Sequence, residues 1–242
     1  MRADGRSFDQ LRPCSIQPGF TRNALGSALI EAGNTRVICT ASVESRPPSW
    51  LDKGGWVTAQ YAMLPGATHP RGRRDPGGRG KEIMRLIGRS LRAAVALDRL
   101  VDTSGDAISI VCDCDVIDAD GGTRTASITG AYVALEIAVS RLIAQGRLAA
   151  SPILGQVAAV SVGIIPHEGS AVPMLDLPYV EDSAAEVDLN VVMLGTGGLV
   201  EVQGTAEGQT FSRAQLTAML DLAEGGIDAL FAVQRAAVEA SR

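Results

Sequence analysis

The sequence predicts an α+β protein in which sheets and helices lie in layers. Each half of the 242-residue chain begins with strand-like segments and continues with a helix-like segment. Residues 107–117 alternate between apolar and polar side chains, which is typical of a strand with one buried face. Residues 81–100 instead place apolar side chains three or four positions apart, which indicates a helix.

The first half predicts three strands before that helix. Residues 26–44 indicate a hairpin whose turn lies at Gly33 and Asn34, and a third strand is expected over residues 55–64. After the alternating strand, a helix rich in small residues is predicted over residues 125–146. The apolar side chains that share one face of the alternating strand are Ile108, Ile110, Cys112, Cys114 and Val116.

The second half predicts four strands and a closing helix. Residues 155–165 and 171–180 indicate two strands, and residues 186–208 indicate a hairpin. Ser212 and Gln215 form a capping-box pattern, which marks the start of the final helix.

The composition is typical of a soluble globular protein. Hydrophobic residues make up 46% and charged residues 20%, and aromatics only 4%, so the core is expected to be aliphatic. The amino terminus has no apolar segment typical of a signal peptide, and no window approaches the roughly 18 apolar residues that cross a bilayer. We therefore expect a cytoplasmic protein without membrane contact. The four cysteines are too scattered for a disulfide framework and are expected to be reduced thiols: Cys14, Cys39, Cys112 and Cys114.

Positive charge is concentrated in one part of the chain. The formal net charge is −5, yet residues 71–92 contain eight basic and two acidic residues, a local charge of +6. The protein is therefore not expected to coat nucleic acid by charge alone, but this segment would attract an anion.

The stretch "DADGGTRTASITGAY", residues 118–132, is the first candidate site. Its "GGTRT" lies between the alternating strand and a predicted helix, where unpaired backbone N–H groups and the helix dipole favour an anion. Arg124 adds a guanidinium suited to phosphate oxygens, and Thr123 adds a hydroxyl donor. The spacing matches neither a Walker loop nor a dinucleotide fingerprint. A helix-capping turn with an exposed arginine is the alternative.

A second Gly-Arg element, "PGGRGKE", places Arg79 directly before the basic helix. A solvated loop tip would have the same composition. Two such loops beside helix starts favour convergence on one phosphate.

The third candidate is acidic. The segment "LDLPYVEDSAAEVDLN" contains five carboxylates and no Lys or Arg, and clustered carboxylates repel unless a cation or a proton relieves them. Mg²⁺ held by one or two carboxylates, water and substrate phosphate would do so, whereas a solvated acidic loop is the alternative. Strand alternation places Asp188 and Asn190 on one face. The carboxylates are Asp176, Glu181, Asp182, Glu186 and Asp188.

Eight blocks follow one another along the chain: "GRSFDQLRP", "TRVICTASVE", "GWVTAQYAMLPGATH", "EIMRLIGRSLRAAV", "CDVIDADGGTRTASITGAYVAL", "AAVSVGI", "DLPYVEDSAAEVDLNVVM" and "VEVQGTAEG". In this order they resemble the bacterial ribonuclease PH family, phosphate-dependent exoribonucleases related to polynucleotide phosphorylase and the exosome ring subunits. The resemblance extends from about Gly5 to the final helix, and several long blocks in register are more specific than one short motif.

The resemblance implies a ribosomal protein S5 domain 2-like fold with two packed lobes. It predicts one exoribonuclease domain over residues 10–141 and a second over residues 157–224. Residues 225–242 are expected to form a C-terminal helix. From the residues alone, Gly225 and Gly226 are expected to bend or split the closing helix. The resemblance also implies a ring-shaped homohexamer, a trimer of dimers.

The resemblance further implies that inorganic phosphate attacks the 3′-terminal phosphodiester of precursor transfer RNA and releases nucleoside 5′-diphosphates. Asp182 and Asp188 would be the catalytic residues and the ligands of Mg²⁺ or Mn²⁺, with Asp176 as a further participant. The phosphate-binding residues would be Arg79, Gly122, Thr123 and Arg124. The candidate RNA contacts are Arg71, Arg73, Arg74, Arg85 and Arg89.

One segment departs from the family pattern. The basic loop is shortened to "PRGRRDP", and Gly66 stands where the family usually has an arginine. A catalytically silent RNA-binding ring subunit is one alternative function, although it predicts the loss of Arg79, Arg124, Asp182 or Asp188. A metal-dependent phosphodiester hydrolase that uses water is the other.

Overall fold

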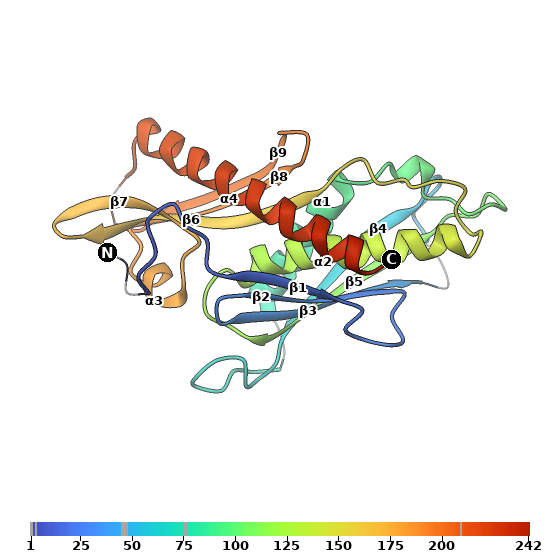
Figure 1. Ribbon diagram of the computed structural model, residues 1–242, viewed down its shortest axis with the longest axis horizontal. Coiled ribbons are helices and arrows are strands. Elements are labelled where there is room, and N and C mark those ends of the chain that lie inside the picture. Colours follow the sequence, from blue (N-terminus) through green and yellow to red (C-terminus); the bar gives the residue numbers. More distant parts are fainter. Residues whose placement is uncertain (1, 3, 45–47, 75–76, 209) are drawn as a thin grey trace.

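The protein is described by a computed structural model that covers residues 2, 4–44, 48–74, 77–208 and 210–242. Asp75 and Pro76, which belong to the predicted basic loop, lie outside the described residues. The chain forms two sheets with helices packed against them, as the α+β prediction requires (Figure 1).

The first sheet has five strands in the order β1-β2-β3-β5-β4. β4 and β5 run parallel and the other neighbours are antiparallel. The predicted inward face of the alternating strand is confirmed, because Ile110, Cys112 and Val116 are all fully buried. The strands are β1 (Cys14–Pro18), β2 (Gly26–Ala32), β3 (Thr35–Val43), β4 (Trp56–Met63) and β5 (Ser109–Asp118).

The second sheet has four antiparallel strands in the order β7-β6-β8-β9. Its buried face forms a separate hydrophobic core with the C-terminal helix. The strands are β6 (Val157–His167), β7 (Ser170–Leu175), β8 (Val187–Leu194) and β9 (Leu199–Ala206).

The helices connect the two sheets into one body. α1 (Gly77–Ala93) packs on β4, and α2 (Thr123–Ala144) packs on β2, β3 and β5. α2 also contacts β6 and α4 (Arg213–Ala240), and α4 covers β6 and β7, so α2 lies between the lobes (Figure 1). α3 (Tyr179–Asp182) is a single turn that leads toward β8. A short 3₁₀ turn covers Leu97–Arg99.

The expectation that no segment is apolar enough to cross a membrane is wrong for α2. The length and composition of α2 would allow it to cross a bilayer, but 78% of its most apolar window is buried inside the fold. Its apolar character matches its position between the two sheets, where few of its side chains can be polar.

Several local expectations differ from the structure. The helix predicted over residues 81–100 spans Gly77–Ala93, so Arg79 lies within it and not before it. The strand predicted over residues 171–180 ends at Leu175, because Asp176 has a φ of +52° and turns the chain toward Pro178 and α3. The closing helix is not split at Gly225 and Gly226, because α4 is continuous from Arg213 to Ala240. A Cβ on Gly226 would lie 2.8 Å from Leu175, so this glycine permits close packing. β1 was not predicted.

Candidate active site

Apart from Asp176, the residues predicted to bind phosphate and metal line one cavity between the two lobes. The cavity has a volume of about 320 Å³. α1 contributes Arg79, the start of α2 contributes Arg124, and the second lobe contributes Asp182 and Asp188. The remaining lining residues are Tyr61, Met63, Thr68, Ala119, Gly121, Gly122, Thr123, Ser161, Tyr179 and Asn190.

The glycine loop (Asp120–Gly122) joins β5 to α2 in a conformation that favours glycine. Gly121 and Gly122 have φ values of +74° and +68°. A Cβ on Gly121 would lie 2.4 Å from the Leu177 carbonyl oxygen, so the loop packs directly on the main chain of the second lobe. Gly122 is the N-cap of α2, and within the described residues no side chain caps its first turn. The first amides of α2 are therefore available to an anion.

Arg124 lines the cavity, and part of its guanidinium is already engaged in hydrogen bonding. Its Nη1 donates to Gln203 Oε1 at 2.8 Å and lies 3.6 Å from Glu82 Oε1. Arg79 is exposed and forms no hydrogen bond or ion pair with another described residue. Both arginines can therefore turn donors toward a bound anion.

Tyr61 supplies a neutral hydroxyl beside Thr123 in the lining of the cavity. Its Oη lies 2.9 Å from Thr123 Oγ1. Burial raises the pKa of the Tyr61 phenol, although Thr123, Arg79 and Arg124 oppose that shift. The hydroxyl therefore stays protonated near neutral pH and remains a possible donor.

Asp182 and Asp188 face the cavity without a full set of partners. Burial raises the pKa of both carboxyls, and the charge of Asp182 raises the pKa of Asp188 further; Arg79 and Arg124 oppose these shifts. Asp188 Oδ2 accepts from Asn190 Nδ2 at 3.5 Å, whereas Oδ1 is buried and has no hydrogen-bond partner among the described residues. The predicted alternation is confirmed, because Asp188 and Asn190 line the cavity while Val187 and Leu189 are buried in the second core.

This donor set fits a divalent cation that keeps several water ligands. The structure holds no group of three or more His, Cys, Asp or Glu side chains suited to a metal within its described residues. Two carboxylates, one of them with an orphaned oxygen, match the incomplete protein shell that Mg²⁺ accepts when a substrate phosphate completes it.

Comparison with protein families follows the same two-lobe division. Residues 10–140 match domain 1 of the 3′ exoribonuclease family, and residues 155–226 match domain 2. The chain belongs to the 3′ exoribonuclease family. Its fold is accordingly the ribosomal protein S5 domain 2-like fold expected from the sequence.

Solved structures with the exoribonuclease fold align along nearly the whole chain. Rrp46 from rice (Oryza sativa) has 17% identity and a TM-score of 0.77, over 98% of this chain and 100% of that chain. The Archaeoglobus fulgidus exosome with RNA bound to the active site has 23% identity and a TM-score of 0.80, over 95% of this chain and 91% of that chain. At these identities the similarity concerns the fold.

Asp176 does not join the other two aspartates in this exoribonuclease-family chain. It lies outside the lining of their cavity, and its carboxylate is paired with Arg12 at 2.6 Å. Burial would raise the pKa of Asp176, but hydrogen bonds from Arg12 and the charges of Arg12 and Arg6 hold it below its usual value. The expectation that Asp176 contributes to the metal site is therefore wrong.

The five predicted RNA contacts lie on two neighbouring elements. Arg73 and Arg74 line a second cavity of about 210 Å³, which shares Arg79 and Tyr61 with the first. Arg71 is exposed in the same loop, and Arg85 is exposed on α1. Arg89 is instead paired with Glu201, to which its Nε and Nη2 donate at 3.0 and 2.6 Å.

Several site residues were not predicted from the sequence. Gln203 lies opposite Asn190 in the β8–β9 register. The predicted hairpin was therefore the sequence signal that could have placed Gln203 near the site. Tyr61 and Arg12 had no comparable signal, because each reaches its partner only after distant segments pack together. Tyr179, at the cavity mouth, is 64% exposed despite its aromatic ring.

Proposed function

We propose that this chain is a phosphate-dependent 3′-to-5′ exoribonuclease that trims precursor transfer RNA and releases nucleoside 5′-diphosphates. The observation that supports this function is the convergence of Arg79, Arg124, Asp182 and Asp188 on one cavity. A catalytically silent subunit would be expected to lack at least one of these side chains, and the chain has all four. We further propose a cytoplasmic homohexamer, a trimer of dimers.

Inorganic phosphate would bind at the positive end of the cavity. Arg79, Arg124 and the first amides of α2 converge there, and Thr123 adds a hydroxyl. These groups would hold the anion beside the scissile phosphodiester and offset the repulsion between the two phosphates. A charged nucleophile thus needs no catalytic serine or histidine to activate it.

The reaction exchanges one P–O bond for another. An oxygen of inorganic phosphate attacks the phosphorus of the terminal nucleotide, and the bond from that phosphorus to the 3′ oxygen of the preceding nucleotide breaks. The departing 3′ oxygen takes a proton, and the terminal nucleotide leaves as a nucleoside 5′-diphosphate. One of the two carboxyls at the acidic end of the cavity, Asp182 or Asp188, whose pKa values are both raised by burial, would donate this proton.

In the alternative assignment, Asp182 and Asp188 together hold Mg²⁺ or Mn²⁺. When bound, the ion would stabilise the negative charge that develops at the transferring phosphate. Asp188 offers its unpartnered Oδ1 for this purpose, and Asn190 keeps the other oxygen oriented.

The RNA would enter over the exposed rim of the cavity. The ring of Tyr179 at this rim offers a stacking surface for an unpaired terminal base. Arg71, Arg73 and Arg74 lie in the adjoining loop, where they would contact backbone phosphates. The RNA bound to the active site of the Archaeoglobus fulgidus exosome supports the same class of ligand.

One assay tests the proposed function. The protein is incubated with a 3′-extended transfer RNA precursor and Mg²⁺, with and without inorganic phosphate, and the mononucleotides are identified. We expect nucleoside diphosphates only when phosphate is present. Monophosphates in phosphate-free buffer would indicate a hydrolase, and no shortening of the RNA would indicate a binding subunit. Native mass measurement tests the hexamer.

A further inference from the structure

Three buried arginines precede β1, and each contacts the segment around Asp176 behind the cavity. Arg2, Arg6 and Arg12, here called the arginine clamp, have exposed fractions of 4%, 7% and 5%. Full burial of this residue type is unusual unless its charge is paired. None of the three lines the candidate active cavity.

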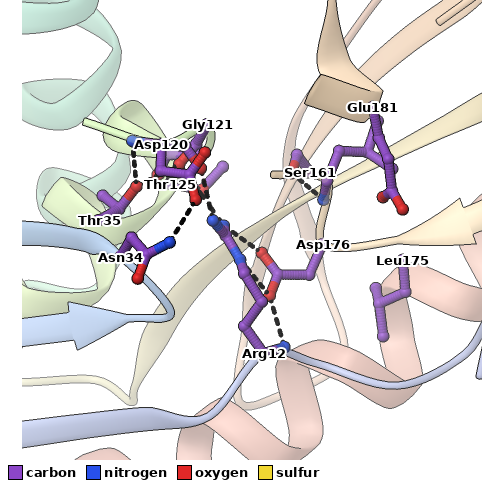
Figure 2. Close-up of polar contacts among 12 residues, drawn as sticks. Arg12, Asn34, Thr35, Asp120, Gly121, Thr125, Ser161, Leu175, Asp176 and Glu181 are labelled. Atoms are coloured by element: carbon purple, nitrogen blue, oxygen red, sulfur yellow. Dashed lines mark hydrogen bonds and ion pairs between the residues drawn. The ribbon is translucent and has the colours of Figure 1, made fainter. Parts of the chain in front are cut away.

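Arg12 joins the glycine loop to the second lobe (Figure 2). Its Nε and Nη2 donate to the two carboxylate oxygens of Asp176 at 3.0 and 2.6 Å, and its backbone N–H donates to Oδ2 at 2.7 Å. Its Nη1 donates to the Asp120 carbonyl at 2.6 Å. One planar guanidinium thus fixes a carboxylate in one lobe against the main chain of the other.

Asp176 is held in a conformation that few non-glycine residues adopt. Its φ of +52° lies in the left-handed region, and its N–H donates to the Ser161 carbonyl at 2.7 Å. Such a conformation persists where surrounding contacts determine it. The turn at Asp176 directs the chain into α3, which ends at Asp182.

Arg2 and Arg6 fix the same segment from the other side. Both donate to the Asp176 carbonyl, at 2.9 and 3.1 Å. Arg2 also binds the buried carboxylate of Glu181 through two contacts at 2.5 and 3.0 Å. Glu181 immediately precedes Asp182, so the clamp holds both ends of the segment that presents this aspartate.

A second connection runs from the glycine loop to α3. The Tyr179 N–H donates to Asp120 Oδ1 at 3.1 Å. Asn34 Nδ2 donates to Asp120 Oδ2 at 3.1 Å (Figure 2). Thr35 Oγ1 donates to the Gly121 carbonyl at 2.7 Å. The loop that faces the anion and the segment that presents Asp182 are therefore part of one hydrogen-bonded unit centred on Arg12.

We propose that Arg12 is a positioning residue that sets the distance between the phosphate-binding glycine loop and Asp182. This inference rests on the proposed function. The guanidinium acts through its contacts with Asp120 and Asp176, and it reaches no substrate atom itself. Lysine at this position would keep the charge but lose the planar fork, because an ammonium cannot bind both carboxylate oxygens and the Asp120 carbonyl in this geometry.

The test compares Arg12→Lys and Arg12→Ala with Arg22→Ala, which removes an exposed arginine of the same N-terminal region. For each folded protein, kcat, the phosphate KM and RNA affinity are measured at saturating Mg²⁺. We expect Arg12→Lys to lower kcat by about 10- to 100-fold, as a displacement near 1 Å can do. The RNA affinity of Arg12→Lys should stay within about twofold of the wild-type value. All three quantities should stay within about twofold for Arg22→Ala.

Guanidinium rescue separates positioning from a general loss of folding. Millimolar guanidinium should restore part of the activity of Arg12→Ala but none of that of Asp182→Ala. An Arg12→Lys protein with wild-type kcat and phosphate KM would overturn the proposal, as would an activity loss equal to the unfolded fraction. If neither Arg12 variant folds, Arg2→Lys is measured in the same way.

A binding readout keeps this proposal distinct from the proposed function. The rise in melting temperature caused by inorganic phosphate alone is recorded for the wild type and for Arg12→Lys. The clamp predicts a smaller rise in the variant, and an equal rise would contradict it. Failure of the wild type to release diphosphates would instead contradict the proposed reaction.

Discussion

The glycine loop separates two arginine–carboxylate groups that differ in how completely their charges are paired. On one side Arg12 and Asp176 are in contact at 2.6 Å, with side chains 5% and 9% exposed. On the other side Asp182 and Asp188 share the cavity with Arg79 and Arg124 but form no ion pair with them among the described residues. The pKa of Asp176 is lowered by its partner, whereas the pKa values of Asp182 and Asp188 are raised by burial.

The difference shows how one acidic segment provides two kinds of carboxylate. A buried charge with a complete set of donors is a structural group, and its removal leaves the partner unpaired. A partly buried carboxylate without such donors destabilises the fold slightly, yet it is ready to bind a cation or a proton. The four predictions below test this division.

The largest effect is expected from the cavity aspartates. Asp182→Ala and Asp188→Asn should each lower kcat by about 10³-fold, because charge stabilisation and proton transfer are lost together. Because the folded-state pKa of Asp188 is raised, the protonated carboxyl stabilises the fold at acidic pH. This stabilisation is lost as the pH rises through the folded-state pKa. Asp188→Asn should therefore unfold at the same or a higher temperature at pH 7. A fully active Asp182→Ala protein would exclude that residue from the reaction.

The opposite pattern is expected for Asp176. Asp176→Asn should lower the free energy of unfolding by about 3 kcal/mol at pH 7, because it leaves the buried Arg12 charge unpaired. Because the pKa of Asp176 is lowered in the folded protein, the ion pair contributes its full stability above the unfolded-state pKa of about 3.9. This stability is lost as the pH falls through the folded-state pKa. Urea unfolding at pH 7 and at pH 3 measures both. If the two proteins have equal stability at pH 7, the ion pair is not structural.

A smaller effect is expected from an arginine that is only partly engaged. Arg124→Ala should raise the phosphate KM by about 10- to 100-fold, the value of one or two hydrogen bonds to a charged group. RNA affinity should change little, because the Arg124 side chain is only 15% exposed. Steady-state kinetics over a phosphate series provide the measurement. An unchanged phosphate KM would remove Arg124 from the phosphate site.

The smallest effect is expected from Arg89, which is already paired with Glu201 on the surface. Arg89→Ala should weaken RNA binding by about twofold at most, because exposed pairs contribute little and its donors are engaged. Arg73→Ala is the matched variant from the loop beside Arg79 and should weaken binding more, with a reduced salt dependence. Filter binding at several salt concentrations distinguishes them. Equal effects would mean that pairing in the free protein does not select the RNA contacts.

The sequence predicted the features that depend on local order. Alternation placed Asp188 and Asn190 on one face of β8, and the Ser212 capping box placed the start of α4. Both follow from backbone geometry within a few residues. The expectation that Asp176 joins Asp182 and Asp188 came from the family resemblance and from their proximity within one acidic segment.

The sequence by itself determined the α+β class, the family resemblance and the charged residues that are available to form a site. Tertiary structure decided which charges meet which. Arg12 and Asp176 are 164 residues apart, and they pair in the folded chain beside the point where the glycine loop packs on the main chain at Leu177. A carboxylate becomes structural or reactive according to the donors that folding brings within about 3 Å, and sequence distance does not specify those donors.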